Sequence, residues 1–441
     1  MAMDRRTLVK YLAGASAAGA LAGCISTEEP DDDGNGDDTG NGADDDDDGD
    51  FEEDEDWETV TPQDGVDGEA ELWHSLSDAE LDAMERFVDE FNEFDPTLTA
   101  DEVSELEDQT TAAIPAGDGP ELFLWAHDWI GDYHQNGFLS DQSDNLNIDP
   151  EEYFGENAES GVFQGEVHGL PWAAETVALV YNREYVDEAP ETFDDVLEIA
   201  AEHHDPAGNV FGFCWPQDAY HVSAMPHGFG PGYYDEDTEE LTLTDDGTIA
   251  GFEYIAEEVW EYMPQDPDGE AQQSIFMEGQ SPFFVTGPWN LGAFDDNDID
   301  FGVMPLPEAD GHTPSPFTGV QLLYFTAEMD EDDERADAAV AFAEWLTTNT
   351  AIASEMAQDH GFIPVHLSFA DDEDDDEVED IPENLEAYSA AVENGQPMPT
   401  APEFGNVWEP LETEWLAVLN EGKDVADAMA DAEDEIRDSW D

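Results

Sequence analysis

The sequence predicts an α/β protein that folds as two or three domain-sized units or as one large two-lobed body. Its 441 residues are 40% hydrophobic and 11% aromatic, which is enough apolar surface for a large core. Short apolar runs typical of strands are separated by helical patterns with one apolar face. A strand followed directly by an amphipathic helix opens the folded part, as in other α/β proteins.

The folded body is expected to begin near Glu69. Residues 70–76 are typical of a strand, and Ser77 with Glu80 forms a capping box for the helix that follows. That helix ends at Asp95-Pro96. Further strands are expected at 121–125, 177–181, 282–286 and 321–325, and helices at 193–201, 249–262, 336–346, 408–419 and 425–436.

The charge of the chain is extreme. Asp and Glu number 116 against 8 Lys and Arg, so the formal net charge is −108. A polyanion of this density repels phosphate backbones and anionic lipid headgroups, which excludes nucleic-acid binding. Molar salt shortens the Debye length to about 3 Å and screens the self-repulsion. We therefore expect a halophilic protein.

Residues 1–24 have the pattern of an export signal. Arg5, Arg6 and Lys10 precede a short apolar segment that is too short to span a membrane. The Arg5-Arg6 pair resembles a twin-arginine signal. The segment ends in Leu-Ala-Gly-Cys24, which resembles a lipobox and predicts lipid attachment at Cys24. Without Cys24, Cys214 has no partner for a disulfide, and its apolar neighbours predict a buried, inert thiol.

Residues 25–68 are expected to be an acidic, disordered tether. Between residues 31 and 56, 16 of 26 residues are acidic and almost none is apolar. Such a segment cannot bury enough surface to offset its chain entropy. The residues from Asp31 imitate the first half of a calcium loop, but Gly42 stands at the twelfth position, where the loop needs Glu. We expect no calcium site here.

Aromatic and acidic side chains gather where several of the expected strands end. The segments are 117–129, 169–182, 286–290 and the start of the late helix at Trp408. Ligands of open α/β sheets collect at the carboxyl ends of strands. An indole ring covers the apolar face of a sugar, and carboxylates form charge-assisted hydrogen bonds with its hydroxyls. This combination predicts a sugar ligand.

The same segments, in this order, resemble the solute-binding proteins of ABC importers, most closely those for maltose and maltodextrin. The resemblance covers about 69–441 and is carried by Gly117-Asp-Gly-Pro, Trp125-Ala-His-Asp128, Asp132 to Leu139, Gly287-Pro-Trp289, Phe301 to Pro307, Pro316-Phe-Thr-Gly319 and the stretch from Met398 to Ile436. It implies a two-lobed periplasmic-binding-protein-like fold with a hinge and an interlobe cleft. Lobe 1 would comprise 69–173 plus 322–370, and lobe 2 would comprise 177–319 plus 380–441.

The resemblance also implies which residues hold the sugar. Lobe 1 and its boundary would contribute Trp125, Asp128 and Glu175, and lobe 2 would contribute Asp218, Tyr220, Trp289 and Trp408. His221 stands where the family has another aromatic residue. Three cationic positions of the family are lost, at Ser77–Asp78, Trp129 and Glu412. Maltose and maltodextrin are therefore the first expectation, and trehalose or sucrose remain alternatives.

Two other classes of protein compete with this interpretation. An extracellular glycoside hydrolase could use Asp128 and Glu175 as its paired carboxylates. A metal protein could use His203, His204 and Asp205, although three consecutive polar residues at a helix end are typical of a solvated terminus. We expect no enzyme activity, no cofactor and no metal.

The partners and the location follow from the same features. The expected partners are an oligosaccharide and the separate permease subunits of an ABC importer. The membrane would be reached only through a lipid anchor, on the extracellular face of the cell membrane. We expect the protein to act as a monomer.

Overall fold

The computed structural model describes residues 58–440, except for 77, 237 and 370–381. The expected export signal, Cys24 and the acidic run 31–56 therefore lie outside the described residues. Residues 58–68 run along the folded body, where the backbone N–H of Val60 donates to Thr348 Oγ1 at 2.9 Å. Among the described residues, no helix has both the length and the apolar character to cross a membrane.

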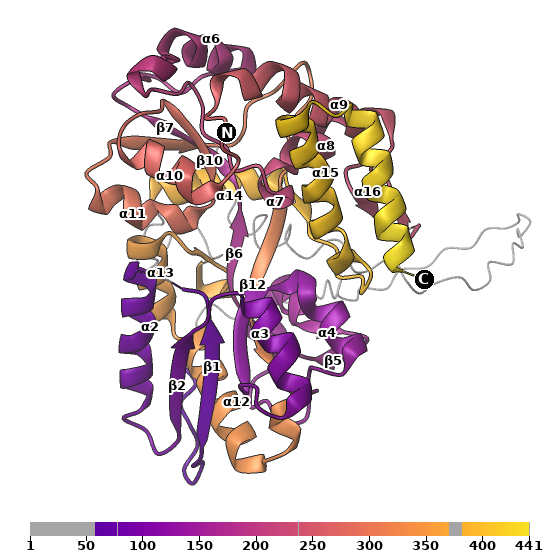
Figure 1. Ribbon diagram of the computed structural model, residues 1–441. Coiled ribbons are helices and arrows are strands. Elements are labelled where there is room, and N and C mark those ends of the chain that lie inside the picture. The colour runs from indigo at the N-terminus through magenta and orange to yellow at the C-terminus, as the bar shows by residue number, and fades with distance from the viewer. Residues whose placement is uncertain (1–57, 77, 237, 370–381, 441) are drawn as a thin grey trace, which may run out of the picture.

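A mixed sheet of seven strands forms the lower lobe in Figure 1. β1 pairs in parallel with both β2 and β3, whereas β12 runs antiparallel to β3 and β6. In order across the sheet, the strands are β13 (Ile363–Pro364), β6 (Gly169–Thr176), β12 (Phe317–Phe325), β3 (Leu122–Ala126), β1 (Glu69–His74) and β2 (Thr97–Glu102), and β14 (Gln396–Pro397) pairs with the start of β12.

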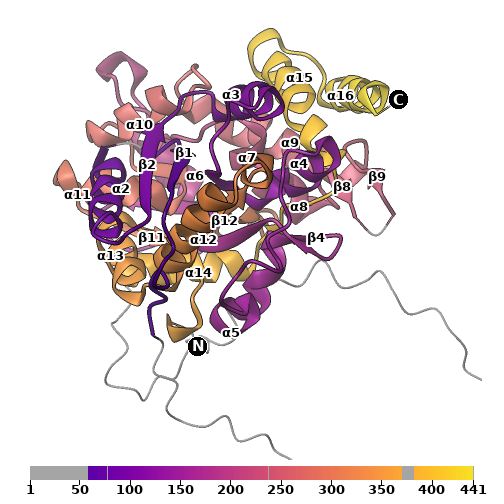
Figure 2. The same cartoon turned by 90° about the horizontal axis from the view of Figure 1, so that it is seen from below.

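Helices cover the large sheet. α12 packs across β1, β2 and β6 and contacts α2, and Figure 2 shows it lying over the sheet when the molecule is seen from below. The helices of this lobe are α2 (Asp78–Phe91), α3 (Leu106–Ala113), α4 (Ile130–Asn136), α5 (Pro150–Phe154), α12 (Asp333–Thr348) and α13 (Thr350–His360), and a small hairpin is formed by β4 (Val162–Phe163) and β5 (Glu166–Val167).

A smaller antiparallel sheet forms the upper lobe in Figure 1. It contains β10 (Phe283–Thr286), β7 (Ala178–Asn182) and β11 (Phe301–Met304), and a separate hairpin contains β8 (Tyr234–Asp235) and β9 (Glu240–Leu241). The helices around it are α6 (Phe193–His203), α7 (Ala219–Val222), α8 (Ala224–Phe229), α9 (Asp246–Tyr254), α10 (Gly269–Met277), α11 (Leu291–Asp296), α14 (Glu383–Glu393), α15 (Trp408–Glu421) and α16 (Val425–Ser439).

Each sheet has its own apolar core. Leu72, Phe123 and Leu323 belong to the core of the large sheet, and Leu179 and Phe283 belong to that of the small sheet. Because side chains alternate along a strand, the next residues, Val180 and Phe284, point to the other face and join the first core. The two-lobed α/β fold expected from the sequence is confirmed.

Two paired strands cross between the lobes. β6 leaves the large sheet at Thr176, and after the fully buried Val177 the chain enters β7 of the small sheet. β12 returns beside β6, with Thr318 opposite Thr176. Both strands run between the lobes in Figure 1. The residues around Glu175 and Gly319 therefore lie at the lobe boundary, a position from which they can contact ligands held between the lobes.

Most of the expected elements are present, with two corrections. The strands expected at 121–125, 177–181, 282–286 and 321–325 are β3, β7, β10 and β12. The segment with Pro171 and Trp172, expected at a strand exit, lies inside β6 instead. The helix expected at 249–262 ends as an α-helix at Tyr254 and continues as a π-turn and a 3₁₀-turn.

Candidate functional site

On the lobe 1 side, β3 delivers an aromatic and an acidic residue to the lobe boundary. Four of the five residues of β3 are buried, and Trp125 is the half-buried exception. Its ring stacks on Trp129 at 4.7 Å and 24°, and Trp129 stacks on Tyr133 at 5.3 Å and 14°. Trp125 also packs against the cores of both lobes. The indole is thus held in a fixed position by a stack of rings.

Asp128 follows in the 3₁₀-turn η2 (His127–Trp129) and is buried. Burial, and after it the charge of Glu175, raises the pKa of its carboxyl to about 8, although a hydrogen bond with the Trp408 side chain opposes the shift. Its Oδ1 atom has no hydrogen-bond partner within the described chain. At neutral pH this carboxyl is therefore mostly protonated and can donate a hydrogen bond.

Glu175 lies near the end of β6, opposite Gly319 of β12. Burial raises the pKa of its carboxyl, and Gln321 opposes the shift because its Nε2 donates to Oε2 at 2.5 Å. A Cβ atom at position 319 would lie 2.8 Å from Glu175 Oε1, so the glycine leaves the space that this carboxyl occupies. No local sequence pattern indicates Gln321, because only the pairing of β6 with β12 brings it to Glu175.

On the lobe 2 side, Asp218 caps the short helix α7. Its side chain accepts from the backbone N–H of His221 at 2.9 Å, and Oδ2 lies 2.8 Å from His221 Nδ1. Burial favours the neutral acid, but the attraction of His221 and these hydrogen bonds together hold the pKa of Asp218 below its usual value. Asp218 is therefore an ionised acceptor at neutral pH.

Three aromatic side chains of lobe 2 are half-buried: Tyr220 and Trp289 near Asp218, and Trp408 beside the Asp128 carboxyl. The Tyr220 ring lies 6.4 Å from that of Trp289 at a tilt of 42°, and Trp408 packs edge-on against Phe404 at 5.0 Å. Burial raises the pKa of Tyr220 well above its usual value, as do the charges of Glu175, Asp128 and Asp218. Tyr220 thus lies among carboxyls from both lobes, and its hydroxyl has no hydrogen-bond partner in the described structure.

These contacts bring the sequence-predicted residues together at the lobe boundary. We call this set the boundary site, and it consists of Trp125, Asp128, Glu175, Asp218, Tyr220, Trp289 and Trp408. A further acid, Glu412, lies near Asp218, since its pKa is raised by burial and by the Asp218 charge. The sequence marked Glu412 only as the loss of a family arginine, so its part in the acidic surroundings of the boundary site was missed.

His203 and His204, which the sequence offered as metal ligands, make other contacts. His203 packs edge-on against Tyr185 at 5.0 Å, and His204 Nδ1 accepts from the backbone N–H of Gly212 at 3.2 Å. Among the described residues, the side chains that could share one metal ion are His134, Glu166 and His168. The prediction for Cys214 is confirmed, since the thiol is buried and free and burial raises its pKa to about 12.

The chemistry of the boundary site suits a neutral ligand with many hydroxyls. Aromatic faces supply apolar contact, a protonated carboxyl can donate, and an ionised carboxylate can accept. None of the seven residues of the boundary site is a lysine or an arginine, the side chains best suited to hold an anionic ligand. The fold and the site together define a two-lobed binding protein for a small polar solute.

Comparison with known proteins gives the family. Residues 83–387, more than half of the chain, match the family described as bacterial extracellular solute-binding protein. The chain belongs to this family. It is 37% identical to the maltotriose-binding protein of Pyrococcus abyssi over 77% of this chain and 75% of the relative. It is also 25% identical to a maltooligosaccharide ABC transporter solute-binding lipoprotein of Streptococcus pneumoniae, over 72% of this chain and 75% of the relative.

The fold is shared with solved structures of sugar-binding proteins. The structure of the Thermus thermophilus maltotriose-binding protein with bound maltotriose matches 84% of this chain and 100% of its own, with a TM-score of 0.73 and 25% identity. This likeness agrees with the two lobes described above.

Proposed function

We propose that the protein is the substrate-binding subunit of an ABC importer that captures maltooligosaccharides outside the cell. The names of the relatives from Pyrococcus abyssi and Streptococcus pneumoniae support this assignment. The relative from Thermus thermophilus supports it further, since its structure contains maltotriose. In this proposal the boundary site is the sugar site.

One observation carries the proposal. Asp128 of lobe 1 and Tyr220 of lobe 2 each have a buried oxygen without a hydrogen-bond partner among the described residues. A buried polar group without a partner costs about 1–3 kcal/mol. Sugar hydroxyls would satisfy both oxygens at once, because a hydroxyl can donate and accept. A ligand that contacts both lobes would stabilise the state in which the lobes are close together.

The lobes proposed for this movement are 69–173 plus 322–370 and 177–319 plus 380–441. The crossing of β6 and β12 near Val177 and Gly319 supports these limits. Hinge bending at a few residues where strands cross between lobes is a common mode of closure around ligands. The sugar would then be released to the permease when the lobes separate.

The proposed setting is the outer face of the cell membrane. Export through residues 1–24, a lipid anchor at Cys24 and the acidic tether that follows it would hold a monomeric, halophilic binding protein beside its permease. The lipoprotein relative from Streptococcus pneumoniae supports the anchor. Mass spectrometry of the protein from its native membrane tests it, because an acylated Cys24 would be the first residue.

Calorimetry in molar salt tests the proposed ligand. We expect maltotriose to bind with one molecule per chain, and maltose, trehalose and sucrose to rank below it. Tight binding of a peptide or a polyamine, with no heat from any saccharide, would contradict the proposal. Salt is needed because the net charge of −108 destabilises the compact state at low ionic strength.

Catalysis is the alternative that this site raises. The raised pKa of Asp128 near Glu175 is a feature that a glycoside hydrolase also needs. We propose that these groups only bind, as the solute-binding family implies. Incubation of the purified protein with maltodextrin should release no shorter sugars. Hydrolysis that is lost in Glu175→Ala would make the protein an enzyme.

A further inference from the structure

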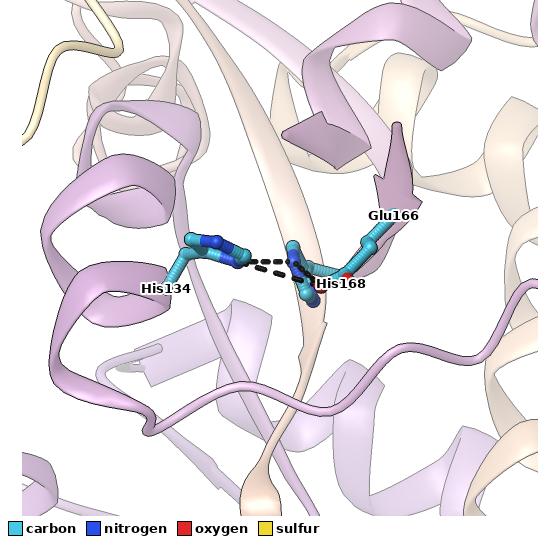
Figure 3. A group of neighbouring side chains, drawn as sticks. All are labelled: His134, Glu166 and His168. Carbon is cyan, nitrogen blue, oxygen red and sulfur yellow. Dashed lines mark hydrogen bonds and ion pairs between the residues drawn. The ribbon is translucent and has the colours of Figure 1, made fainter. Parts of the chain in front are cut away.

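Two histidines and a glutamate meet on lobe 1, outside the boundary site. His134 comes from α4, Glu166 from β5, and His168 from the single residue between β5 and β6. Figure 3 shows the two imidazole rings facing each other and Glu166 reaching toward them from the far side. A helix and a strand end about thirty residues further along the chain therefore direct nitrogen and oxygen atoms at one point.

The distances between these atoms fit a small metal ion. His134 Nδ1 lies 2.9 Å from His168 Nε2, and Glu166 Oε2 lies 3.6 Å from the former and 3.5 Å from the latter. A tetrahedral zinc ion, with bonds of about 2.1 Å, holds its ligand atoms about 3.4 Å apart. Only small side-chain movements would thus bring the three atoms to the separation that zinc requires.

The protonation of His168 is set by its second nitrogen. His168 Nδ1 lies 3.0 Å from the carbonyl oxygen of Ser140, which can only accept, so Nδ1 must carry a proton. In a neutral ring, the lone pair of Nε2 then points at His134 and Glu166. Metal-binding histidines usually have this arrangement, in which the other nitrogen donates to a backbone carbonyl.

The surroundings hold the imidazole rings of His134 and His168 in place and leave the Glu166 side of the group open to solvent. His168 is 1% exposed, and its backbone is held on both sides, by Gly161 O at 2.8 Å and by Phe325 N at 2.8 Å. The His134 ring packs against Phe163 at 5.2 Å. The Glu166 side chain is 47% exposed, so solvent reaches the group from its side. A water molecule could therefore complete a set of three protein ligands.

We propose that His134 Nδ1, His168 Nε2 and a Glu166 oxygen bind one divalent transition-metal ion of the zinc class, with water as the fourth ligand. Imidazole and carboxylate ligands suit zinc, whereas magnesium and calcium prefer sets of oxygen ligands. The bound ion would tie α4, which follows directly after the turn that carries Asp128, to the start of β6, which ends at the lobe boundary. It would act as a structural clamp within lobe 1.

Equilibrium dialysis of zinc against the full chain tests the proposal. The buffer should contain molar sodium nitrate, since chloride complexes zinc, and excess magnesium to occupy the many surface carboxylates. We expect one zinc ion per chain and at least tenfold weaker binding in His134→Ala and in Glu166→Gln. Both substituted side chains are at least partly exposed, so these variants should fold.

Matched controls are His203→Ala and Glu156→Gln, which remove the same residue types elsewhere. They should bind zinc as the wild type does. Cobalt in place of zinc should give the strong visible absorption of a four-coordinate site, and this absorption should be lost in His134→Ala. Equal zinc binding in the wild type and in His134→Ala would overturn the proposal, as would weak cobalt absorption typical of six-coordinate surface binding.

Discussion

The two sides of the boundary site hold their aromatic rings in different ways. On lobe 1, Trp125 lies on a stack that continues through Trp129 to the buried Tyr133. On lobe 2, Trp289 meets Tyr220 at 42° and His221 at 89°, so neither of these rings stacks flat on it. Both indoles are partly buried and pack against a core, and they differ in that Trp125 has a second indole stacked on its face.

The carboxyls of Asp128 and Asp218 also differ between the two lobes, in their pKa. The pKa of Asp128 is raised to about 8 by burial and by the Glu175 charge, and that of Asp218 is lowered, against the effect of burial, by its contacts with His221. At neutral pH, lobe 1 thus offers a donor and lobe 2 an acceptor. A sugar hydroxyl can pair with either group, so the difference suits a neutral polyol better than an ion.

The largest expected effects separate the two tryptophans. Trp289→Ala should weaken maltotriose binding by about 30-fold, or about 2 kcal/mol, and lower the free energy of unfolding less than Trp125→Ala does. Trp125→Ala should weaken binding similarly and also destabilise the fold by about 2 kcal/mol, since it removes part of a packed stack. Calorimetry and urea unfolding in molar salt measure both quantities.

Trp260→Ala is the control, since it removes another half-buried tryptophan of lobe 2 and should leave the affinity unchanged. If Trp289→Ala binds maltotriose as tightly as the wild type, that residue lies outside the sugar site.

Asp128→Asn should change how stability depends on pH. The folded-state pKa of about 8 exceeds the unfolded value of about 3.9, so the folded protein binds the extra proton between these limits. The contribution of Asp128 to the free energy of unfolding is therefore fully present below about pH 3.9 and is lost as the pH rises to about 8. The asparagine variant avoids this loss and should be more stable than the wild type by about 2 kcal/mol at pH 9.

The two proteins should have similar stability only near or below pH 4, the unfolded pKa of an aspartic acid. Urea unfolding across this range measures the difference, and Asp144→Asn, at an exposed acid of lobe 1, is the control. Parallel pH profiles for Asp128→Asn and the wild type would mean that Asp128 is ionised in the folded protein.

Asp218→Asn should change the free energy of unfolding in the opposite direction, by lowering it at neutral pH. The lowered pKa of Asp218 contributes stability above the unfolded value of about 3.9, and this contribution is lost as pH falls below it. The variant keeps the helix cap, because Asn caps as well as Asp, but loses the attraction to His221. We expect a loss of about 1 kcal/mol at pH 7, since the side chain is 38% exposed and partly screened.

The same urea series, extended to pH 3, measures this effect. A deficit that persists unchanged at the lowest pH would show that the charge of Asp218 is not its cause.

Tyr220→Phe should have the smallest effect. It removes a buried hydroxyl that has no hydrogen-bond partner in the described structure, so the free protein should be as stable as the wild type or up to about 1 kcal/mol more stable. Maltotriose binding should weaken about fivefold, because the hydroxyl is expected to bond to the sugar. An unchanged affinity in calorimetry would remove this hydroxyl from the sugar site.

The sequence predicted the strands well where apolar runs were continuous, as at β3 and β10. It misplaced Pro171 and Trp172, because proline usually interrupts a sheet. Here Pro171 lies opposite Leu322 and the next pair is Ala173 with Gln321, so Trp172 is the extra residue of an irregular step in the ladder. Such a step depends on the partner strand and leaves no mark in the local sequence.

The residues of the candidate site also fall into those that the sequence indicates and those that only the fold reveals. The resemblance to a family supplied the seven residues of the boundary site, and the structure brings them together. Gln321 and Glu412 depend on strand pairing and helix packing, so no local pattern indicates their part. The His134, Glu166 and His168 group was missed because 32 residues separate the first two, and that spacing matches no metal motif.

The most direct test of the central claim is a crystal structure of the protein grown with maltotriose in molar salt. We predict one sugar chain whose rings lie against Trp125 and Trp289, with hydroxyls bonded to Asp128 from one lobe and to Asp218 from the other. A sugar that touches only one lobe, or that binds away from these four side chains, would contradict the account.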